Sequence, residues 1–439
     1  MPDHVRKGCD AAKRRAVRFT PQLVPVQPEF VCYTDSVPER YDVILVGGGI
    51  IGSSVAMALA VRRVKVAVVD IDLSGRLSSS EKNAGGVRAT WWQPVNIALC
   101  RASIDYYHSV QAEVGFRQKG YLWLYDDRAW SGALEHFDLQ RSLGQPITVL
   151  TPAQVHARVP EIDRLDGVAG ATFSPEDGLI NPNLLKEHYR SRSREAGAIY
   201  LDRVYVHAAV VDSSEVRLQC WQASQSLSDE ALARLMSDDR QGEPQTGKLF
   251  ELCSGAVAIT TGAWSDNALR LFGLPNYTEP IRRQLCLVDN RETNLSAYGM
   301  IVDASGLYFH NEGAHILAGY SPPDTPAGHC FEYDGEPFFQ SEIWPRMFAR
   351  MSCCERLRHI TGWAGLYEVS PDRSAIVGRA APRIFEAHSF SGRGVMQSYG
   401  AGQALAELIA DGEYSQFDAS ALSRERFERG ELVTEELHI

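Results

Sequence analysis

Three glycines and one acidic residue near the start of the chain are spaced in a way that could bind a nucleotide. Gly47, Gly49 and Gly52 fill the positions Gly-x-Gly-x-x-Gly, and Asp70 follows 18 residues after Gly52 (70 − 52). Glycines in this pattern permit a tight turn and let the backbone approach a pyrophosphate, and an acid at that distance accepts hydrogen bonds from ribose hydroxyls. The spacing therefore predicts a dinucleotide site.

The segments around these residues are typical of a strand, a helix and a second strand. Residues 41–46 and 64–69 are apolar runs, and residues 51–62 between them form a helix rich in small side chains. The first N–H groups of that helix, from Ile50 and Ile51, would face the phosphates together with the positive end of the helix dipole. An acid instead of an arginine closes the unit, which favours FAD or NAD over NADP.

The next segment favours FAD. Residues 77–88, LSSSEKNAGGVR, form a loop rich in serine and glycine that does not continue the alternation of strand and helix expected of a full NAD domain. Its hydroxyl, amide and backbone donors suit a second pass over a long phosphate and ribityl chain. The candidate contacts in this loop are Ser79, Ser80, Asn83, Ala84, Gly85, Gly86 and Val87.

From this loop onward the sequence resembles the D-amino-acid oxidase superfamily, which contains sarcosine oxidase, glycine oxidase and dimethylglycine dehydrogenase. Three further blocks match in the order of the family: 174–204 with SPEDGLINPN, 256–274 with its GAWS turn, and 362–412 with GWAGLYEVSPDRSAIVG and SFSGRGVMQSYGAGQ. A nearer likeness, in AGGVRATWWQPVNIALC and FFQSEIWPRM, is to the branch of FAD-dependent oxidoreductase domain-containing proteins, whose mitochondrial members are linked to assembly of respiratory complex I.

The resemblance implies an α/β fold in two interleaved domains. A Rossmann-like FAD-binding domain of the glutathione-reductase type would comprise residues 38–100, 165–275 and 360–425, with a polar surface insertion at 222–248 that could carry a short helix. Residues 101–164 and 276–359 would form a substrate domain with an antiparallel sheet over the flavin, including strand-like runs at 120–125 and 279–289. Residues 1–37 would be an N-terminal extension and 426–439 a C-terminal tail.

The resemblance also implies where the flavin is held along the rest of the chain. The glycine-rich stretch 391–397 opens the last helix, so its N–H groups could face the flavin ring. The implied cofactor contacts outside the first loop are Val204, Thr261, Gly262, Trp264, Gly365, Gly392, Arg393, Gly394, Val395, Met396 and Gln397.

Four side chains are candidates for catalysis: Arg88, Tyr367, Arg393 and His310. Arg88 could stabilise reduced flavin or form a surface ion pair, and Arg393 could meet a substrate carboxylate or point to solvent. His310 and Tyr308 could face the cavity that holds the substrate, although a lone histidine on a strand is more often structural. Because successive side chains on a strand point to opposite faces of the sheet, one of Arg282 and Arg283 should point inward, and the sequence does not show which one.

The implied reaction is oxidation of the C–N bond of an amine or amino acid by hydride transfer to the flavin. Gly365 occupies the position of the flavin-linking cysteine of covalent sarcosine oxidases, and Asn83 stands near a histidine of other relatives, so FAD is expected to be bound non-covalently. Residues 306–319 contain no lysine that could activate oxygen, which favours a dehydrogenase. The electron acceptor stays open among oxygen, a quinone and an electron-transfer protein. The alternatives are a 2-hydroxy-acid dehydrogenase and a flavoprotein that assists assembly of a respiratory complex.

The composition argues against several classes of protein. The chain has 439 residues, 44% hydrophobic and 23% charged, with a formal net charge of −11, which argues against a general nucleic-acid binder. No run approaches the roughly 18 apolar residues of a membrane span. Nine scattered cysteines without a CxxC pair indicate reduced thiols, neither a disulfide framework nor a metal site. We expect a cytoplasmic protein, or a mitochondrial matrix protein if the source is eukaryotic, acting on a small molecule.

Overall fold

The fold contains the β-α-β unit that the glycine pattern predicts. A computed structural model describes residues 39–237, 247–289, 293–435 and 437, so the N-terminal extension lies outside the described residues. Strand β1 (Glu39–Val46), helix α1 (Ile50–Val61) and strand β2 (Val66–Asp70) follow one another, and β1 pairs in parallel with β2. The three expected elements are confirmed to within two residues at each end.

The first sheet has eight strands and carries this unit at its centre. Its order is β17-β18-β11-β1-β2-β8, with β10 paired to β11 and β9 paired to β10. The β1–β11, β1–β2, β2–β8 and β11–β18 pairs are parallel. The remaining strands of the sheet are β8 (Ile199–Asp202), β9 (Val204–Val211), β10 (Val216–Ala223), β11 (Gly247–Ile259), β17 (Ile376–Ala381) and β18 (Ile384–His388).

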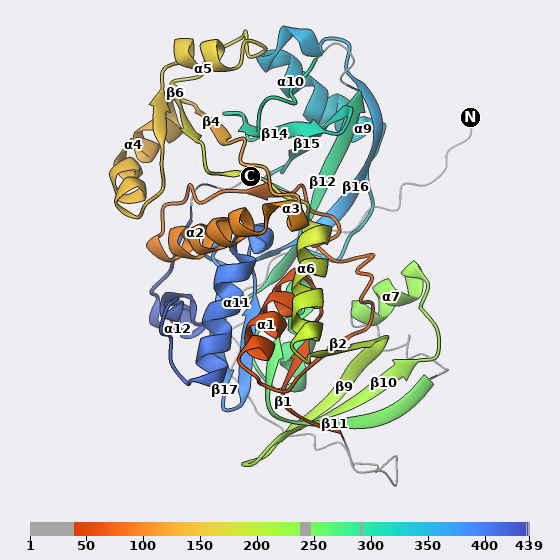
Figure 1. Cartoon of the computed structure of the whole chain (residues 1–439). Coiled ribbons are helices and arrows are strands. Elements are labelled where there is room, and N and C mark those ends of the chain that lie inside the picture. The colour runs from red at the N-terminus through yellow and green to blue at the C-terminus, as the bar shows by residue number, and fades with distance from the viewer. Residues whose placement is uncertain (1–38, 238–246, 290–292, 436, 438–439) are drawn as a thin grey trace, which may run out of the picture. The chain divides into compact units, whose positions relative to one another are not determined.

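Helix α1 is buried almost throughout its length. It packs against α6 (Pro182–Glu195) and α11 (Gly394–Ala410), and α11 packs in turn against α2 (Pro94–Ser109). Figure 1 shows α11, α1 and α6 side by side near β1 and β2. Small residues permit this approach, because a β-carbon at Gly402 of α11 would lie 2.2 Å from the Ser54 hydroxyl oxygen of α1. A helix that is apolar all round requires such a covered position.

The second sheet also has eight strands, in the order β16-β12-β15-β14-β13-β4-β6-β5. The pairs are antiparallel except for β13 and β4, which are parallel, so the expected sheet is mixed and not purely antiparallel. The strands are β4 (Tyr121–Tyr125), β5 (Thr148–Leu150), β6 (Gly170–Ser174), β12 (Glu279–Asp289), β13 (Met300–Val302), β14 (Tyr308–Glu312), β15 (His315–Tyr320) and β16 (Arg358–Val369).

Strand pairing places two segments differently from the expected division of the chain. Strand β6 falls in the segment 165–275, and most of β16 falls in the segment 360–425, both assigned to the flavin domain, yet both strands lie in the second sheet. The reason for β16 is its length, because eleven of its residues pair with β12 and its second half supplies the motif that resembles flavin binding. The family motif therefore begins on a strand of the substrate sheet.

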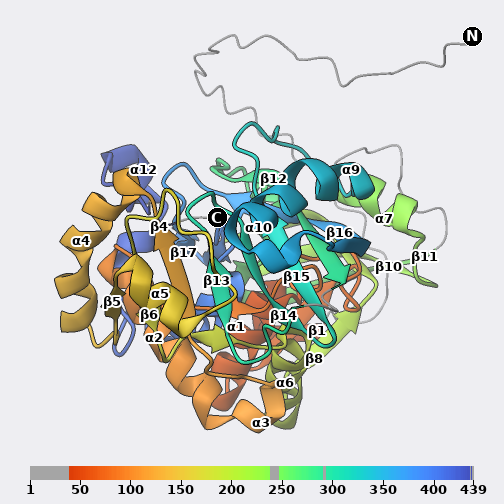
Figure 2. The same cartoon turned by 90° about the horizontal axis from the view of Figure 1, so that it is seen from above.

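The polar insertion and the C-terminal tail both contribute buried residues. The described part of the insertion contains α7 (Asp229–Met236), which buries Leu232 and Leu235, so this part is more than a surface excursion. The predicted tail, 426–439, begins within α12 (Glu425–Arg429), and it buries Val433, Glu435 and Leu437. Figures 1 and 2 show α7 and α4 (Asp127–Ser142) at opposite sides of the described part of the chain.

The remaining elements are short. They are α3 (Gln111–Val114), α5 (Pro152–Arg158), α8 (Ser265–Leu271), α9 (Glu336–Phe338), α10 (Trp344–Arg350), the pair β3 (Gly86–Val87) and β7 (Gly178–Leu179), the 3₁₀ turns η2 (Gly262–Trp264), η4 (Ser352–Cys354) and η5 (Ser420–Leu422), and the π-helical turn η3 (Phe339–Ile343). In the described part of the chain, no helix has the length and apolar character needed to cross a bilayer.

Candidate functional site

One large cavity, of about 240 Å³, extends between the two sheets. One end is formed by the turn between β1 and α1, and the other by side chains of β4, β12, β14 and β16. Most of the residues that the sequence predicts to hold a cofactor line it: Gly47, Gly49, Ile50, Ile51, Asp70, Ser79, Ser80, Asn83, Ala84, Gly86, Val204, Thr261, Gly262, Trp264, Gly365, Gly392, Gly394, Val395 and Met396.

The three glycines of the first turn have different roles. A β-carbon at Gly52 would lie 1.9 Å from the Gly47 carbonyl oxygen, and one at Gly47 would lie 2.5 Å from the Thr260 carbonyl oxygen. At Gly49 the nearest atom to an added β-carbon is the Ser80 hydroxyl oxygen, 3.5 Å away. Gly47 and Gly52 therefore allow protein to pack on protein, which explains why Gly52 does not line the cavity, whereas Gly49 leaves room for a ligand.

The end of β2 places a carboxylate beside this turn. The Asp70 side chain accepts hydrogen bonds from the Gly48 N–H, at 2.6 Å, and from the Asp72 N–H, at 2.8 Å. Burial raises the pKa of Asp70. Its position at the strand end is that expected of a ribose-binding acid.

Two cations on α6 complete this end of the cavity, and the sequence reasoning missed both. Lys186 lines the cavity and forms an ion pair with Glu81. Arg190 also lines it and donates from Nη2 to the Gly48 carbonyl oxygen at 2.7 Å. Their spacing of four residues puts both on one helix face, a signal that was available in the sequence. Together with the N-terminus of α1, they suit a pyrophosphate.

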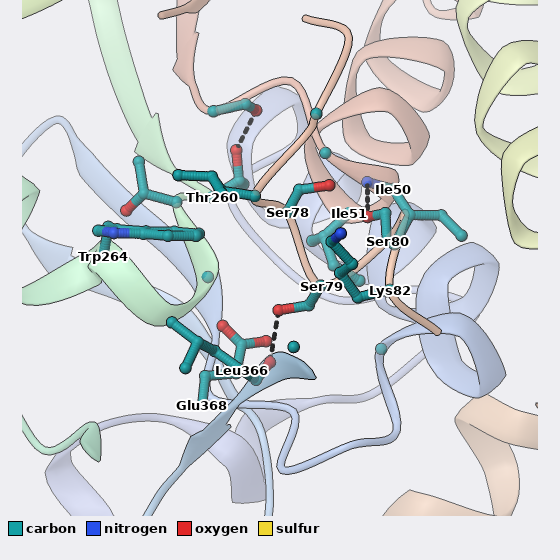
Figure 3. A pocket seen from close by; sticks show the side chains of 18 of the residues that line it. Ile50, Ile51, Ser78, Ser79, Ser80, Lys82, Thr260, Trp264, Leu366 and Glu368 are labelled. Carbon is teal, nitrogen blue, oxygen red and sulfur yellow. Dashed lines mark hydrogen bonds between the residues drawn. The ribbon is translucent and has the colours of Figure 1, made fainter. Parts of the chain in front are cut away.

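The serine-rich loop forms one wall of the middle of the cavity. Ser79 donates to the Leu366 carbonyl oxygen at 2.6 Å, and Ser80 accepts from the Ile50 N–H at 3.0 Å. Figure 3 shows these two bonds on either side of the loop, with Trp264 and Glu368 around the same space. The loop thus connects α1 to β16, as expected of a segment that runs along an extended ligand.

Glu368 is a buried carboxylate that faces the cavity. Its Oε1 accepts from the Phe390 N–H at 3.2 Å, and its Oε2 has no hydrogen-bond partner among the described residues. Burial raises the pKa of Glu368. An unpartnered buried oxygen is costly unless a ligand satisfies it, so the middle of the cavity fits a polar chain such as the ribityl part of FAD.

The far end of the cavity combines one arginine with three tyrosines. Arg283, Tyr121, Tyr308 and Tyr367 line it, and the Arg283 guanidinium lies 5.2 Å from the centre of the Tyr367 ring. The Arg283 Nε has no partner in the described chain. Its neighbour Arg282 instead pairs with Asp334, at 2.9 and 3.0 Å. These contacts show that Arg283 is the one of the two arginines that points inward.

Each of the three tyrosine rings packs on a glycine. An added β-carbon would lie 2.1 Å from the Tyr121 hydroxyl at Gly86, 2.3 Å from the Tyr308 ring at Gly319, and 2.4 Å from the Tyr367 ring at Gly392. Burial raises the pKa of all three phenols. The tyrosines are therefore fixed in place and remain protonated hydrogen-bond donors at neutral pH.

His310 lies outside the cavity lining. It is 2% exposed, and its Nε2 and Nδ1 lie 2.9 Å and 3.0 Å from the carbonyl oxygens of Ala84 and Asn311. Both ring nitrogens contact backbone carbonyl oxygens, which suits a residue that positions the loop carrying Ala84. A catalytic role of His310 stays a prediction.

Arg88 and Arg393 are not among the residues that line this cavity, and their expected roles beside the flavin stay predictions. Arg88 donates to the carbonyl oxygens of Thr90, at 2.6 Å, and Leu437, at 2.9 Å. Both guanidiniums lie against the Trp91 ring, at 3.5 Å for Arg88 and 4.7 Å for Arg393. They line a second, smaller cavity of about 30 Å³ that adjoins the first, because Tyr367, Gly392 and Met396 line both.

Three other predicted cofactor contacts do not line the main cavity. Gln397 is buried and donates to the Asn96 side chain at 3.0 Å. Gly85 takes a positive φ of 74° because its loop must turn there, and Val87 is buried on β3. All three belong to the packing that supports the loop and α11.

The non-covalent binding of FAD stays a prediction, and two observations agree with it. The described residues that line the main cavity include no cysteine or histidine. A β-carbon at Gly365 would approach the Lys82 β-carbon to 2.7 Å, so the loop leaves no room there for the side chain that a covalent link would use.

Comparison with known proteins finds relatives that match along most of this chain. The FAD-dependent oxidoreductase domain-containing protein 1 of Xenopus laevis is 28% identical over 427 residues, covering 90% of this chain and 84% of that protein. Glycine oxidase of Geobacillus kaustophilus is 23% identical, covering 88% of this chain and 97% of that protein.

The fold matches solved structures as well. The crystal structure of L-proline dehydrogenase from P. horikoshii superposes with a TM-score of 0.77 at 22% identity, covering 90% of this chain and all of that one. Residues 42–408 match the family described as FAD dependent oxidoreductase, DAO, whose cofactor is FAD. The resemblance drawn from the sequence motifs is confirmed, and the chain belongs to the DAO family of FAD-dependent oxidoreductases.

Proposed function

We propose that this oxidoreductase oxidises the C–N bond of an amine or amino acid that carries a carboxylate, as sarcosine, glycine or a D-amino acid does. The observation that carries the proposal is the far end of the main cavity, where Arg283 is surrounded by Tyr121, Tyr308 and Tyr367. Among the described residues Arg283 has no acidic partner, and such a guanidinium is suited to a carboxylate, which it can meet with two parallel hydrogen bonds.

The lack of a carboxylate base at this end of the described lining supports an amine over a hydroxy acid. In the described lining of the cavity, the carboxylates are Asp70 and Asp72 at the nucleotide end and Glu368 beside Gly262 and Trp264. Oxidation of a hydroxy acid requires a group that takes the hydroxyl proton as the hydride leaves. A neutral amine needs no such base, because its own lone pair forms the new C=N bond.

The proposed reaction balances without further groups from the chain. The C–H bond next to nitrogen breaks, its hydrogen and both electrons leave as hydride, and water later hydrolyses the resulting iminium to a carbonyl compound and a free amine. FAD, when bound, supplies the two-electron oxidant that accepts the hydride. The chain holds the carboxylate at Arg283, donates hydrogen bonds from the tyrosines and keeps the reacting carbon in place.

We propose further that the enzyme is a dehydrogenase. The proposal rests on the sequence argument that the stretch now seen as β14 and β15 contains no lysine. Lys82 does line the main cavity, which the sequence reasoning did not consider, and its backbone carbonyl oxygen accepts from the Trp363 indole at 3.0 Å. Lys82 is therefore the residue to replace with methionine if oxygen proves to be the acceptor.

The test is an anaerobic titration of the purified FAD-bound protein while the visible flavin absorbance is followed. N-methylated glycines and D- or L-amino acids should bleach it, and 2-hydroxy acids should not. Bleaching by 2-hydroxy acids alone would overturn the amine proposal. No bleaching by any compound, in protein that dithionite reduces, would favour the alternative of an assembly factor. Rapid recovery of colour on admission of air would overturn the dehydrogenase assignment.

A further inference from the structure

The second cavity has no place in the reaction proposed above, yet its lining is strongly positive. Three of the residues that line it are Arg88, Arg373 and Arg393, and none of its described lining residues is acidic. The N-terminus of α11 meets it at Arg393, with no acidic residue in the first turn of the helix. Each of these features favours an anion.

The donors of the two buried arginines are incompletely satisfied. Arg393 is 2% exposed, and neither its Nε nor its Nη2 has a partner in the described chain. The Arg88 Nε likewise lacks a partner, and its other bonds are to uncharged carbonyl oxygens. A buried guanidinium without a counter-ion is expensive, which indicates that a ligand supplies the missing charge.

The nearest carboxylates are held by other groups. Glu435 accepts from the backbone N–H groups of Trp92 and Gln93, at 3.0 to 3.2 Å. Asp372 accepts from two nitrogens of Arg426, at 2.7 and 3.0 Å. Neither carboxylate lines the second cavity. The charges of Glu435 and Asp372 therefore offset part of the positive charge of the arginines, but neither carboxylate accepts a hydrogen bond from Arg393.

The two cavities meet at Tyr367. This residue lines both, with Arg283 on the side of the main cavity and Arg393 on the side of the second. Arg373 is exposed and lines the second cavity, so an acid could enter there from solvent. A single ligand with an anion at each end could thus contact arginines on both sides of the Tyr367 ring.

We propose that the substrate is a dicarboxylic amine or amino acid, with one carboxylate at Arg283 and the second at Arg393 and Arg373. This inference rests on the proposed function, since it assigns the first carboxylate to the same site. It narrows the substrate class from amino acids in general to those with a second acidic group.

The first test measures binding without turnover. Acetate and propionate are compared with succinate and glutarate on the FAD-bound protein, and each titration follows the flavin difference spectrum. One additional charge-assisted contact should make the better diacid bind about 30-fold more tightly than the monoacids. Equal affinities of diacids and monoacids would overturn the inference.

Two variants locate the second carboxylate. Arg393→Gln and Arg373→Gln should each lower the ratio of diacid to monoacid affinity at least about fivefold, a loss expected for one hydrogen bond to a charged group. Arg373 is exposed, so its variant tests the idea even if the buried change prevents folding. The control is Arg379→Gln, which removes an exposed guanidinium stacked on Phe385 outside both cavities. The assignment would be overturned if the ratio of diacid to monoacid affinity were unchanged in Arg373→Gln and, where that protein folds, in Arg393→Gln as well.

A second readout separates this inference from the proposed function. N-methylalanine and N-methylaspartate differ by one carboxylate, and the second should bleach the flavin at the lower concentration. If the diacids bind preferentially but no amine bleaches the flavin, the proposed function fails and the anion site stands. If both amines bleach it equally well, the function stands and the second anion site fails.

Discussion

At the scale of single residues, the site depends on side chains whose neighbours determine what they can do. Arg282 and Arg283 are adjacent on β12, yet Arg282 pairs with Asp334 whereas Arg283 lines the main cavity. Alternation along the strand makes one arginine structural and leaves the other free for a ligand. The pair therefore provides a variant and its matched control on the same strand.

Replacing Arg283 with methionine should weaken carboxylate-bearing amines by about 30- to 150-fold, since a charge-assisted bidentate contact of roughly 2–3 kcal/mol is lost. Arg282→Met removes the same charge one residue away and should change the affinity by less than about threefold, because it loses only a contact outside the cavity. The measurement is the concentration of amine that half-reduces the flavin under anaerobic conditions. Equal losses in both variants would show a general effect of charge, and no loss in Arg283→Met would remove Arg283 from the site.

At the scale of elements, the turn between β1 and α1 separates packing from ligand binding within a few residues. Gly52 is required because α1 touches the backbone at Gly47, whereas Gly49 faces the cavity. The two glycines look equivalent in the motif, and only the packed structure tells them apart. This difference leads to opposite expectations for the two alanine variants.

Gly49→Ala should leave the apoprotein as stable as the parent, because the nearest atom to the new β-carbon is 3.5 Å away. The same variant should weaken FAD binding at least about tenfold, because the β-carbon occupies the approach to the pyrophosphate. Gly52→Ala should instead destabilise the apoprotein by about 1–3 kcal/mol, since its β-carbon would lie 1.9 Å from the Gly47 carbonyl oxygen. Thermal midpoints of the apoproteins and FAD titrations distinguish the two. Loss of stability in Gly49→Ala with unchanged FAD affinity would contradict this division of roles.

Local patterns predicted the elements well, because each is decided by neighbouring residues. The glycine turn, the strands at 41–46 and 279–289 and the helix at 51–62 follow from periodicity and turn chemistry alone. The sequence could not show that β16 belongs to the second sheet, since that depends on pairing with β12, which precedes it by about seventy residues. The surroundings of Arg88 could not be predicted for the same reason, because its partners Trp123 and Leu437 come from distant parts of the chain.

At the scale of the whole molecule, the last residues of the chain return to the first sheet and to the residues around the second cavity. Arg424 meets Glu386 of β18 with two bonds of 2.6 and 2.7 Å, and Arg426 meets Asp372 in the turn that carries Arg373. The Leu437 carbonyl oxygen accepts from Arg88. The segment predicted as a C-terminal tail, residues 426–439, therefore contacts Arg88 and the turn that carries Arg373. The attachment of this end of the chain should be visible in the pH dependence of unfolding.

Glu386 is the clearest source of that dependence. It is fully buried between Arg424 and His388, whose Nε2 lies 3.0 Å away. Desolvation opposes its charge, but the hydrogen bonds and charges of His388 and Arg424 outweigh that cost and lower the pKa of Glu386 to about 2. Because the folded pKa lies below the unfolded value near 4.5, its stabilisation is present above pH 4.5 and is lost as the pH falls towards 2.

We expect Glu386→Gln to flatten the loss of stability between pH 5 and pH 2.5, where the pKa difference corresponds to about 3 kcal/mol in the parent. At pH 7 the variant should be less stable by a similar amount, since Arg424 loses its buried partner. The control is Glu425→Gln, which removes an exposed carboxylate paired with Arg429 at 3.2 Å in the same segment and should follow the parent curve. Urea midpoints at pH 7, 5, 4 and 3 give the comparison. Parallel curves for the parent and Glu386→Gln would mean that this carboxylate does not couple the C-terminal segment to the sheet, and the acid lability of the protein would then have to originate elsewhere.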